Sequence, residues 1–159
     1  DQIVQMDADF SHSPEKVIVL LDGLKNHDMV LGSRYVDGGS LDQDWAFWRK
    51  ALSAFGNLYT RLIIGTKVKD ITGGFRAWRR ETLEGIPLDR VKSQGYAFQI
   101  EMAYITSLNG YSILEVPIYF AERTRGDSKM SLRIQLEAAF RVWTILAEYK
   151  DLRRKKARQ

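Results

Sequence analysis

A short apolar run, a helix-start signal and a second short apolar run follow one another within the first 35 residues. Residues 2–6 have the pattern of a buried strand, and residues 29–31 have the pattern of a second one. Between them, residues 13–15 (SPE) supply a capping serine, a proline at the first helical position and an acid in the first turn. Strand, helix and strand of these lengths predict a βαβ unit with the two strands paired in parallel.

The rest of the chain continues this alternation of strands and helices. Apolar residues recur at steps of three and four over residues 45–62, which predicts a long helix ended by Gly65. Residues 113–120 predict a strand that is bulged or at an edge, because Pro117 cannot donate to a ladder. We also expect a short strand through residue 78 and helices over 80–83, 97–109 and 132–149. These elements predict one α/β domain over residues 1–150, followed by a solvated basic tail over 151–159.

Composition excludes several classes of function. The chain has no cysteine, which excludes a disulfide framework and a cysteine-based zinc site and is compatible with the cytoplasm. It has no apolar run of transmembrane length. The net charge is only +4, and the aromatic residues have helical spacing, so we expect no nucleic acid partner. The basic residues that crowd the C-terminus could instead attract anionic lipid head groups.

Two aspartates follow the first predicted strand. Asp7 and Asp9 are two residues apart, so both carboxylates can point to one face at the carboxyl end of that strand. Ligands bind at this edge in open α/β sheets, and Mg²⁺ or Mn²⁺ prefers carboxylate oxygens. Asp is also a common turn former, so the pair alone leaves a metal site and a simple turn open. His12 is expected to lie beside Asp9.

Other polar residues could bind anions or substrate. The loop 123–129 (RTRGDSK) combines three cations with a glycine and a serine, a composition suited to phosphate, and Arg34 and Arg76 could add contacts. Gln99 and Glu101 lie on a mainly apolar helix, where a carboxylate needs either a hydrogen-bonding partner or a catalytic role.

The amphipathic helix over residues 45–62 allows two interpretations. Its apolar side could pack on the protein's own core, which the pattern alone favours. Alternatively, the helix could lie at a membrane surface with its tryptophans at the interface.

Five segments of the chain together resemble a known family. They are MDADFSHSPE, VLGSRYVDGG, VKDITGGFRAWRR, YAFQIEM and EVPIYFAERTRGDSKMS, in this order. The series resembles the dolichol-phosphate mannose synthase family of polyprenol-phosphate glycosyltransferases, which are inverting enzymes of the GT-A type. The resemblance covers residues 1–150 and implies a Rossmann-like GT-A sheet with flanking helices.

The resemblance implies a reaction and a set of partners. A nucleotide sugar, typically GDP-mannose, would give its sugar to a membrane polyprenyl phosphate with inversion, assisted by Mg²⁺ or Mn²⁺. It implies a peripheral position on the cytoplasmic face of a membrane, with anchoring that could involve a partner subunit. It also favours the membrane-facing interpretation of the helix over 45–62.

By resemblance, the site residues take the following roles. Asp7 and Asp9 would hold the metal, and Asp9, Gln99 and Glu101 would be catalytic. Donor binding would also involve Asp70, Thr72 and Arg76. The acceptor phosphate would be bound by Arg34, Arg123, Arg125, Ser128 and Lys129. The membrane-facing residues would be Trp45, Trp48 and Phe55.

The family begins with strand–helix units that bind the nucleotide, and this chain starts after them. We therefore expect the C-terminal part of a GT-A domain, and we expect the isolated 159 residues to bind donor poorly. Two alternatives stay open. One is a relative that uses a UDP-sugar such as UDP-glucose or an aminosugar donor. The other is a non-catalytic scaffold at the membrane surface, which would have no need of a metal at Asp7 and Asp9.

Overall fold

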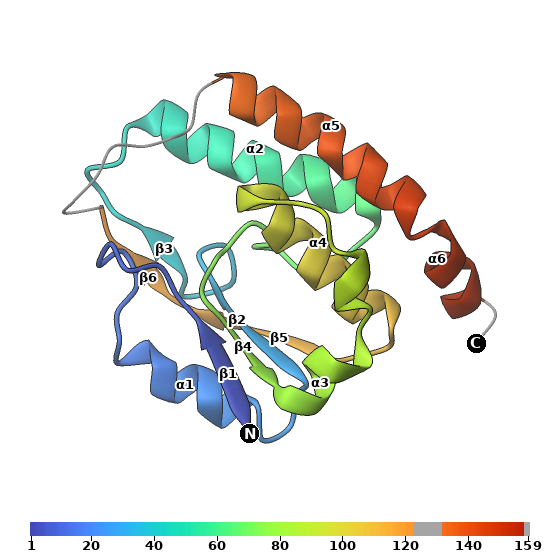
Figure 1. Cartoon of the computed structure of the whole chain (residues 1–159). Coiled ribbons are helices and arrows are strands. Elements are labelled where there is room, and N and C mark those ends of the chain that lie inside the picture. Colours follow the sequence, from blue (N-terminus) through green and yellow to red (C-terminus); the bar gives the residue numbers. More distant parts are fainter. Residues whose placement is uncertain (123–131, 158–159) are drawn as a thin grey trace.

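A four-stranded mixed sheet forms the centre of the domain (Figure 1). The computed structural model describes residues 1–122 and 132–157, with the side chains of 132–136 left out. The strand order is β1-β4-β2-β5. Both β1 and β2 pair antiparallel with β4, and β2 pairs in parallel with β5. The strands are β1 (Gln2–Gln5), β2 (Met29–Ser33), β4 (Arg76–Arg79) and β5 (Ile113–Pro117).

The prediction that the first two strands pair with each other is wrong. Strands β1 and β2 do run in the same direction, but β4 lies between them and pairs Ala77 with Val4 on one side and with Val30 on the other. Local patterning identifies a strand and the face that it buries, whereas the choice of neighbour depends on contacts distant in sequence. The buried triplet of β4 could not be assigned to the centre of the sheet from its pattern alone.

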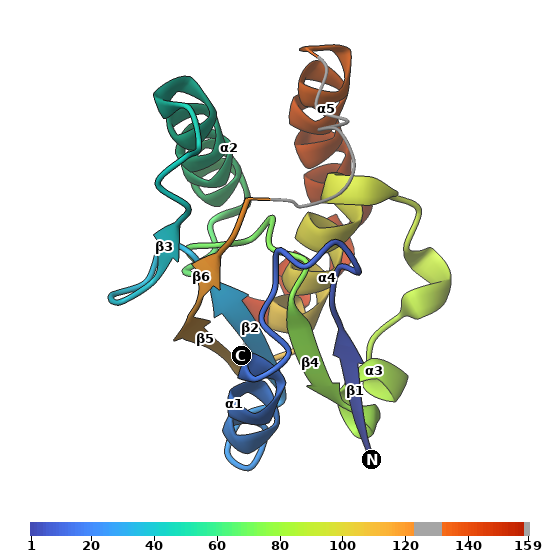
Figure 2. The same cartoon turned by 90° about the vertical axis from the view of Figure 1, so that its left-hand side faces the viewer.

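The two faces of the sheet bury separate apolar clusters. In β2, Val30 packs toward α1 (Lys16–Gly23), while Met29 and Leu31 join the opposite cluster with α4 (Gly95–Leu108). This alternation follows from the two-residue period of a strand. Figure 2 shows α1 and α4 on opposite sides of the sheet. The sheet is therefore covered on both faces, as the α/β prediction requires.

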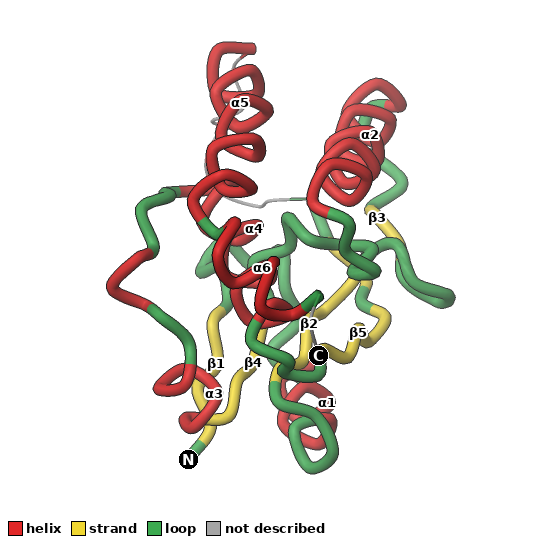
Figure 3. Tube along the Cα trace, turned by 90° about the vertical axis from the view of Figure 1, so that its right-hand side faces the viewer, coloured by secondary structure: helices red, strands yellow, loops and turns green. Residues whose placement is uncertain are grey.

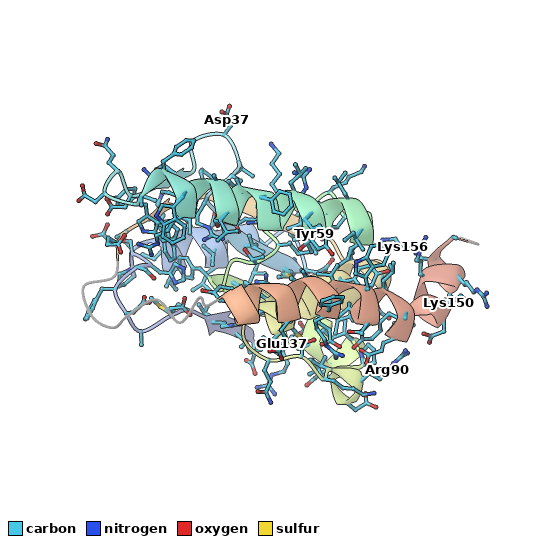
Figure 4. All side chains as sticks on the ribbon, turned by 90° about the horizontal axis from the view of Figure 1, so that it is seen from above. Asp37, Tyr59, Arg90, Glu137, Lys150 and Lys156 are labelled. Atoms are coloured by element: carbon cyan, nitrogen blue, oxygen red, sulfur yellow. The ribbon has the colours of Figure 1, made fainter. Side chains whose placement is uncertain are left out.

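Two long helices, α2 (Phe47–Ile64) and α5 (Leu132–Glu148), lie side by side over α4 (Figures 1 and 4). The Tyr59 hydroxyl joins them, donating to the Ala139 carbonyl at 3.3 Å and accepting from the Trp143 indole at 3.0 Å. Helix α2 ends at Gly65 in the left-handed conformation (φ 74°), as predicted. The remaining helical pieces are α3 (Arg80–Gly85), a 3₁₀ turn (Leu88–Arg90) and α6 (Lys150–Lys156).

The strand predicted over residues 113–120 is divided between two sheets. Strand β5 ends at Pro117, and β6 (Tyr119–Phe120) pairs in parallel with β3 (Ser40–Leu41). Between them, the Ile118 amide donates to the Ser33 carbonyl at 3.0 Å. The edge position predicted from Pro117 is confirmed, because β5 is the outermost strand of its sheet.

The segment 151–159, predicted as a solvated basic tail, is largely exposed and contains most of α6. Figure 3 shows α6 following α5, with the chain turning between them. Asp151 accepts two hydrogen bonds from the Arg90 guanidinium at 2.8 and 2.9 Å, and Lys156 donates to the Ser107 carbonyl at 2.6 Å. These contacts dock the basic helix on the domain. Among the described residues, the structure contains no helix with the length and apolar character needed to cross a membrane.

Candidate active site at the carboxyl ends of β1 and β2

The loop that follows β1 folds its two aspartates into a tight turn. The Asp9 carboxylate accepts hydrogen bonds from the amide and the hydroxyl of Ser11. Between them Phe10 has a left-handed backbone (φ 63°) and an exposed side chain. Asp7 lies against Gly74, where an added Cβ would approach the Asp7 carboxylate to 3.3 Å. Because Gly74 has no side chain, the Asp7 carboxylate can occupy this position.

His12 supports this loop from beneath instead of lining an open site. Its side chain is buried, and its ring stacks on Phe75 with 4.9 Å between centroids. The Nδ1 atom accepts a hydrogen bond from the Asp7 amide at 3.3 Å. Burial lowers the pKa of His12, an effect that the charges of Asp7 and Asp9 oppose in part. A neutral ring fits its role as an acceptor of the Asp7 amide.

The two carboxylates suit one kind of metal site. Among the described residues, no group of three or more His, Cys, Asp or Glu side chains could by itself hold a metal ion. Mg²⁺ is commonly bound by one or two carboxylates together with substrate phosphates and water. Asp7 and Asp9, both half-buried at the end of β1, match that pattern. Metal binding there stays a prediction.

Arg34 follows β2 and forms the best-defined ion pair near the site. Its Nε and Nη2 atoms donate to the Asp70 carboxylate at 2.7 and 2.6 Å, and Nη2 also donates to the Thr72 hydroxyl at 3.1 Å. Burial acts to lower the pKa of Arg34, but the bonds and charge of Asp70 outweigh it and raise the pKa. Three residues expected from the sequence at the site are thus brought together.

Phe120 connects the aspartate loop with this ion pair. Its ring lies 5.2 Å from the His12 ring and 5.3 Å from the Arg34 guanidinium carbon. The Ala121 amide that follows donates to the Ser11 carbonyl at 3.2 Å. The aspartate loop and Arg34 therefore belong to one continuous site at the carboxyl ends of β1 and β2.

Arg76 is buried beneath the loop that precedes β4. Its guanidinium donates to the backbone carbonyls of Gly73, Ile71 and Gln99 at 2.6–2.7 Å. Burial lowers the pKa of Arg76 to about 9, with Asp70 opposing the shift, so the group stays charged at neutral pH. All three nitrogens hold the backbone in place. The predicted contact of Arg76 with the donor therefore gains no support from this structure.

Glu101 is also buried, with its own set of partners. Its carboxylate accepts from the Ser93 amide at 2.8 Å and from the Tyr149 hydroxyl at 2.8 Å, and Arg141 lies 4.0 Å away. These bonds fasten α4 to the end of α5 and account for the buried charge without a substrate. Gln99 differs, because its side-chain oxygen is buried and has no hydrogen-bond partner among the described residues. Catalytic roles for both residues stay predictions.

The exposed side of α2 is apolar along its whole length. Its exposed large side chains are Phe47, Trp48, Phe55, Leu58 and Leu62. On α5, Phe140 and Trp143 are exposed as well. Figure 4 looks down on these two helices. Packing on the protein's own core, the interpretation that the pattern alone favoured, is thus wrong for this side of α2. Of the three residues predicted to face a membrane, Trp48 and Phe55 are exposed.

Trp45, the third of them, is turned toward the domain. It is half-buried, with its ring edge-on to Phe120 at 5.7 Å and the Arg49 guanidinium 4.2 Å from its centroid. Arg49 also forms an ion pair with Glu122 at 3.0 Å. Four predicted phosphate-binding residues lie outside the described residues: Arg123, Arg125, Ser128 and Lys129.

Comparisons with known proteins identify the family of this chain. Residues 1–86 match the family model described as glycosyl transferase family 2. The chain is 45% identical over 155 residues to the undecaprenyl-phosphate mannosyltransferase of Micrococcus luteus, covering 96% of this chain and 63% of that protein. It is 48% identical over 141 residues to the polyprenol monophosphomannose synthase of Mycolicibacterium smegmatis, covering 88% of this chain and 53% of that protein. The chain thus spans somewhat more than half the length of these relatives.

A solved structure supports the fold. The crystal structure of M. tuberculosis glucosyl-3-phosphoglycerate synthase superposes with a TM-score of 0.54 at 19% identity, covering 93% of this chain and 49% of that chain. At this identity the likeness concerns the fold alone. The predicted GT-A sheet with flanking helices is confirmed.

Proposed function

This chain belongs to glycosyl transferase family 2, and we propose that it forms the catalytic part of a polyprenyl-phosphate mannosyltransferase. The names of the two relatives above support a polyprenyl phosphate acceptor and a mannosyl product. One structural observation carries the proposal. A carboxylate pair and Arg34, whose side chain is 10% exposed, share one edge of the sheet, and α2 beside them has an apolar exposed side. A soluble acceptor would not need that side.

In the proposed reaction, an oxygen of the acceptor phosphate attacks the anomeric carbon of the sugar. The bond from that carbon to the nucleotide diphosphate breaks, and the configuration inverts. GDP-mannose is the proposed donor. Asp7 and Asp9 are the residues that would hold Mg²⁺ or Mn²⁺, which would neutralise charge on the departing diphosphate. The acceptor is already an anion, so the chain needs no strong base.

Arg34 is the described residue best suited to bind the acceptor phosphate. Asp70 and Thr72 engage its Nε and Nη2 atoms, and Nη1 is the nitrogen that they do not contact. Asp70 is fully buried, so in this conformation it holds Arg34 in place. The four cationic and hydroxyl groups of residues 123–129 are proposed to complete the phosphate site.

We propose that the protein lies peripherally at the cytoplasmic face of a membrane. The apolar exposed sides of α2 and α5 would lie in the interface, where aromatic side chains are favourable. The cationic side chains of α6 would add attraction to anionic head groups. An anchoring partner subunit is compatible with this arrangement.

The test is transfer of labelled sugar to polyprenyl phosphate by the protein at its natural length. We expect transfer from GDP-mannose in the presence of Mg²⁺ or Mn²⁺, and loss of transfer in the Asp9→Ala variant. Transfer from UDP-glucose instead would retain the acceptor and replace the donor. A protein that transfers neither sugar and binds no Mn²⁺ would support the scaffold alternative.

A further inference from the structure

Helix α2 has its polar side turned toward the domain, and this side contacts the loops of the candidate site. Ser53 accepts a hydrogen bond from the Tyr35 hydroxyl at 2.7 Å, directly after Arg34. One turn further, Asn57 accepts from the amide and the hydroxyl of Thr72 at 3.2 and 3.3 Å. The helix that carries the apolar exposed side therefore bonds to both loops that hold Arg34.

Asn57 occupies the central position in these contacts. Its side chain is 3% exposed, and its amide nitrogen donates to the Ser53 carbonyl at 3.1 Å, which directs the oxygen toward Thr72. The Thr72 hydroxyl, which donates to Asn57, accepts in turn from Arg34 Nη2 at 3.1 Å. A continuous chain of hydrogen bonds thus runs from α2 to the guanidinium.

A buried asparagine is costly unless its polar atoms are paired. A helix that only needed to pack here could use an apolar residue, as α2 does with Ile64 on its buried side. The side-chain oxygen of Asn57 instead accepts hydrogen bonds from Thr72, which lies in a loop distant in sequence and contacts Arg34. Its hydrogen bonds therefore serve the placement of the loop.

We propose that Asn57 is a positioning residue that links the position of α2 to that of Thr72 and, through Thr72, to that of Arg34. When the apolar side of α2 binds a bilayer, α2 is held in one position, and Arg34 is held where it can bind the acceptor phosphate. This inference rests on the proposed function, because it assigns Arg34 to that phosphate. It adds that contact with a membrane surface improves the binding of the acceptor head group.

The experiment uses a short-chain, water-soluble isoprenyl phosphate as acceptor, with the protein at its natural length. Transfer is measured with and without vesicles of phosphatidylcholine and phosphatidylglycerol that contain no acceptor. In the unaltered protein, we expect the vesicles to lower the acceptor KM several-fold while the donor KM stays constant. In Asn57→Leu, we expect the acceptor KM to be about tenfold higher and the vesicles to leave it unchanged.

Two variants separate positioning from simple packing. Asn57→Asp keeps an oxygen that can accept from Thr72 and loses only the donation to the Ser53 carbonyl, so it should restore most of the acceptor KM and of the response to vesicles. Thr60→Val alters a buried polar residue three positions along the same helix and should behave as the unaltered protein. Vesicle binding should be equal in all four proteins, because none of the changes affects the exposed side.

The outcomes distinguish the inference from the proposed function. No transfer by the unaltered protein to any isoprenyl phosphate would overturn both. Transfer with an Asn57→Leu variant that keeps the acceptor KM and the vesicle response of the unaltered protein would overturn the inference alone. A fall in kcat with both KM values unchanged, not restored by Asn57→Asp, would assign Asn57 to packing and would also overturn it.

Discussion

Removing two of the exposed aromatic side chains of α2, Trp48 and Phe55, should weaken membrane binding strongly. Trp48 is 64% exposed and Phe55 is 62% exposed, although both are large apolar residues. An aromatic side chain buries about 200 Å² when fully covered, so roughly 250 Å² of this pair faces water. At about 25 cal/mol per Å², covering all of it would contribute about 6 kcal/mol.

An interfacial helix immerses only one side, so about half of this area should leave the water, or about 3 kcal/mol. The double variant Trp48→Ala, Phe55→Ala should therefore lower the vesicle partition coefficient roughly a hundredfold. Vesicle sedimentation at low and high salt measures this. Because the lost contribution is apolar, the decrease should persist at high salt, where attraction by the basic residues of α6 is screened.

A matched control lies on the other side of the sheet. Ile18 and Val19 of α1 are 73% and 41% exposed, so the double change Ile18→Ala, Val19→Ala also removes exposed apolar area. We expect this control to bind vesicles as the unaltered protein does. If the α2 variant bound vesicles as well as the unaltered protein does, the membrane role of this surface would be refuted. If the α1 control lost as much binding as the α2 variant, vesicle binding would depend on exposed apolar area in general and not on α2.

Three further predictions concern buried and charged groups. Glu101→Gln should cost about 2 kcal/mol in the free energy of unfolding, measured with urea, because a charged acceptor of several hydrogen bonds is lost. Gly74→Ala should weaken Mn²⁺ binding in a calorimetric titration, because the new methyl group crowds the Asp7 carboxylate. Hydrogen bonds from Arg90 lower the pKa of Asp151 from 3.8 to about 2, so the stability lent by this ionised group is complete above about pH 4 and is lost as the pH falls through about 2. Asp151→Asn should make unfolding less dependent on pH across that range.

Each of these predictions has an outcome that contradicts it. Unchanged stability with lost transfer in Glu101→Gln would favour the catalytic role predicted for this residue. For Gly74→Ala, the control is Gly56→Ala, since a Cβ at Gly56 meets nothing within 4 Å. Equal Mn²⁺ affinities in these two variants would show that Gly74 does not limit the position of Asp7. An Asp151→Asn variant with the same acid dependence as the unaltered protein would exclude that carboxylate as its source.

The sequence predicted most elements of the fold because their signals are local. Residues 13–15 did announce α1, but the roles predicted for them are wrong, because α1 begins at Lys16 with Glu15 as its N-cap and has no capping side chain. Gly65 ended α2, and Pro117 marked an edge strand. The place of β4 between β1 and β2 had no local signal. Nor did the division of residues 113–120 between two sheets, because the Ile118 amide bonds to Ser33, which is distant in sequence.

The site was predictable in its residue types more than in their arrangement. The sequence indicated Asp7, Arg34 and Asp70, but it could not show that Asp70 is paired with Arg34 and fully buried. Arg76 donates to backbone carbonyls, which every residue has, so no sequence pattern could identify these partners. Asn57 was visible only as a polar residue on one side of a helix.

The orientation of α2 explains why that polar side was hard to interpret. An apolar stripe on a helix usually marks the side that packs on a core, since water disfavours exposed apolar area. In α2 the stripe faces outward, and the inward side bears Ser53 and Asn57, whose partners are the loops of Arg34 and Thr72. If a bilayer covers the exposed side of α2, its apolar side chains leave water while its inward polar side chains keep their hydrogen bonds. The outward apolar stripe and the hydrogen bonds of α2 to the site loops therefore have one common explanation, and changes on either side of the helix should affect binding of the same acceptor.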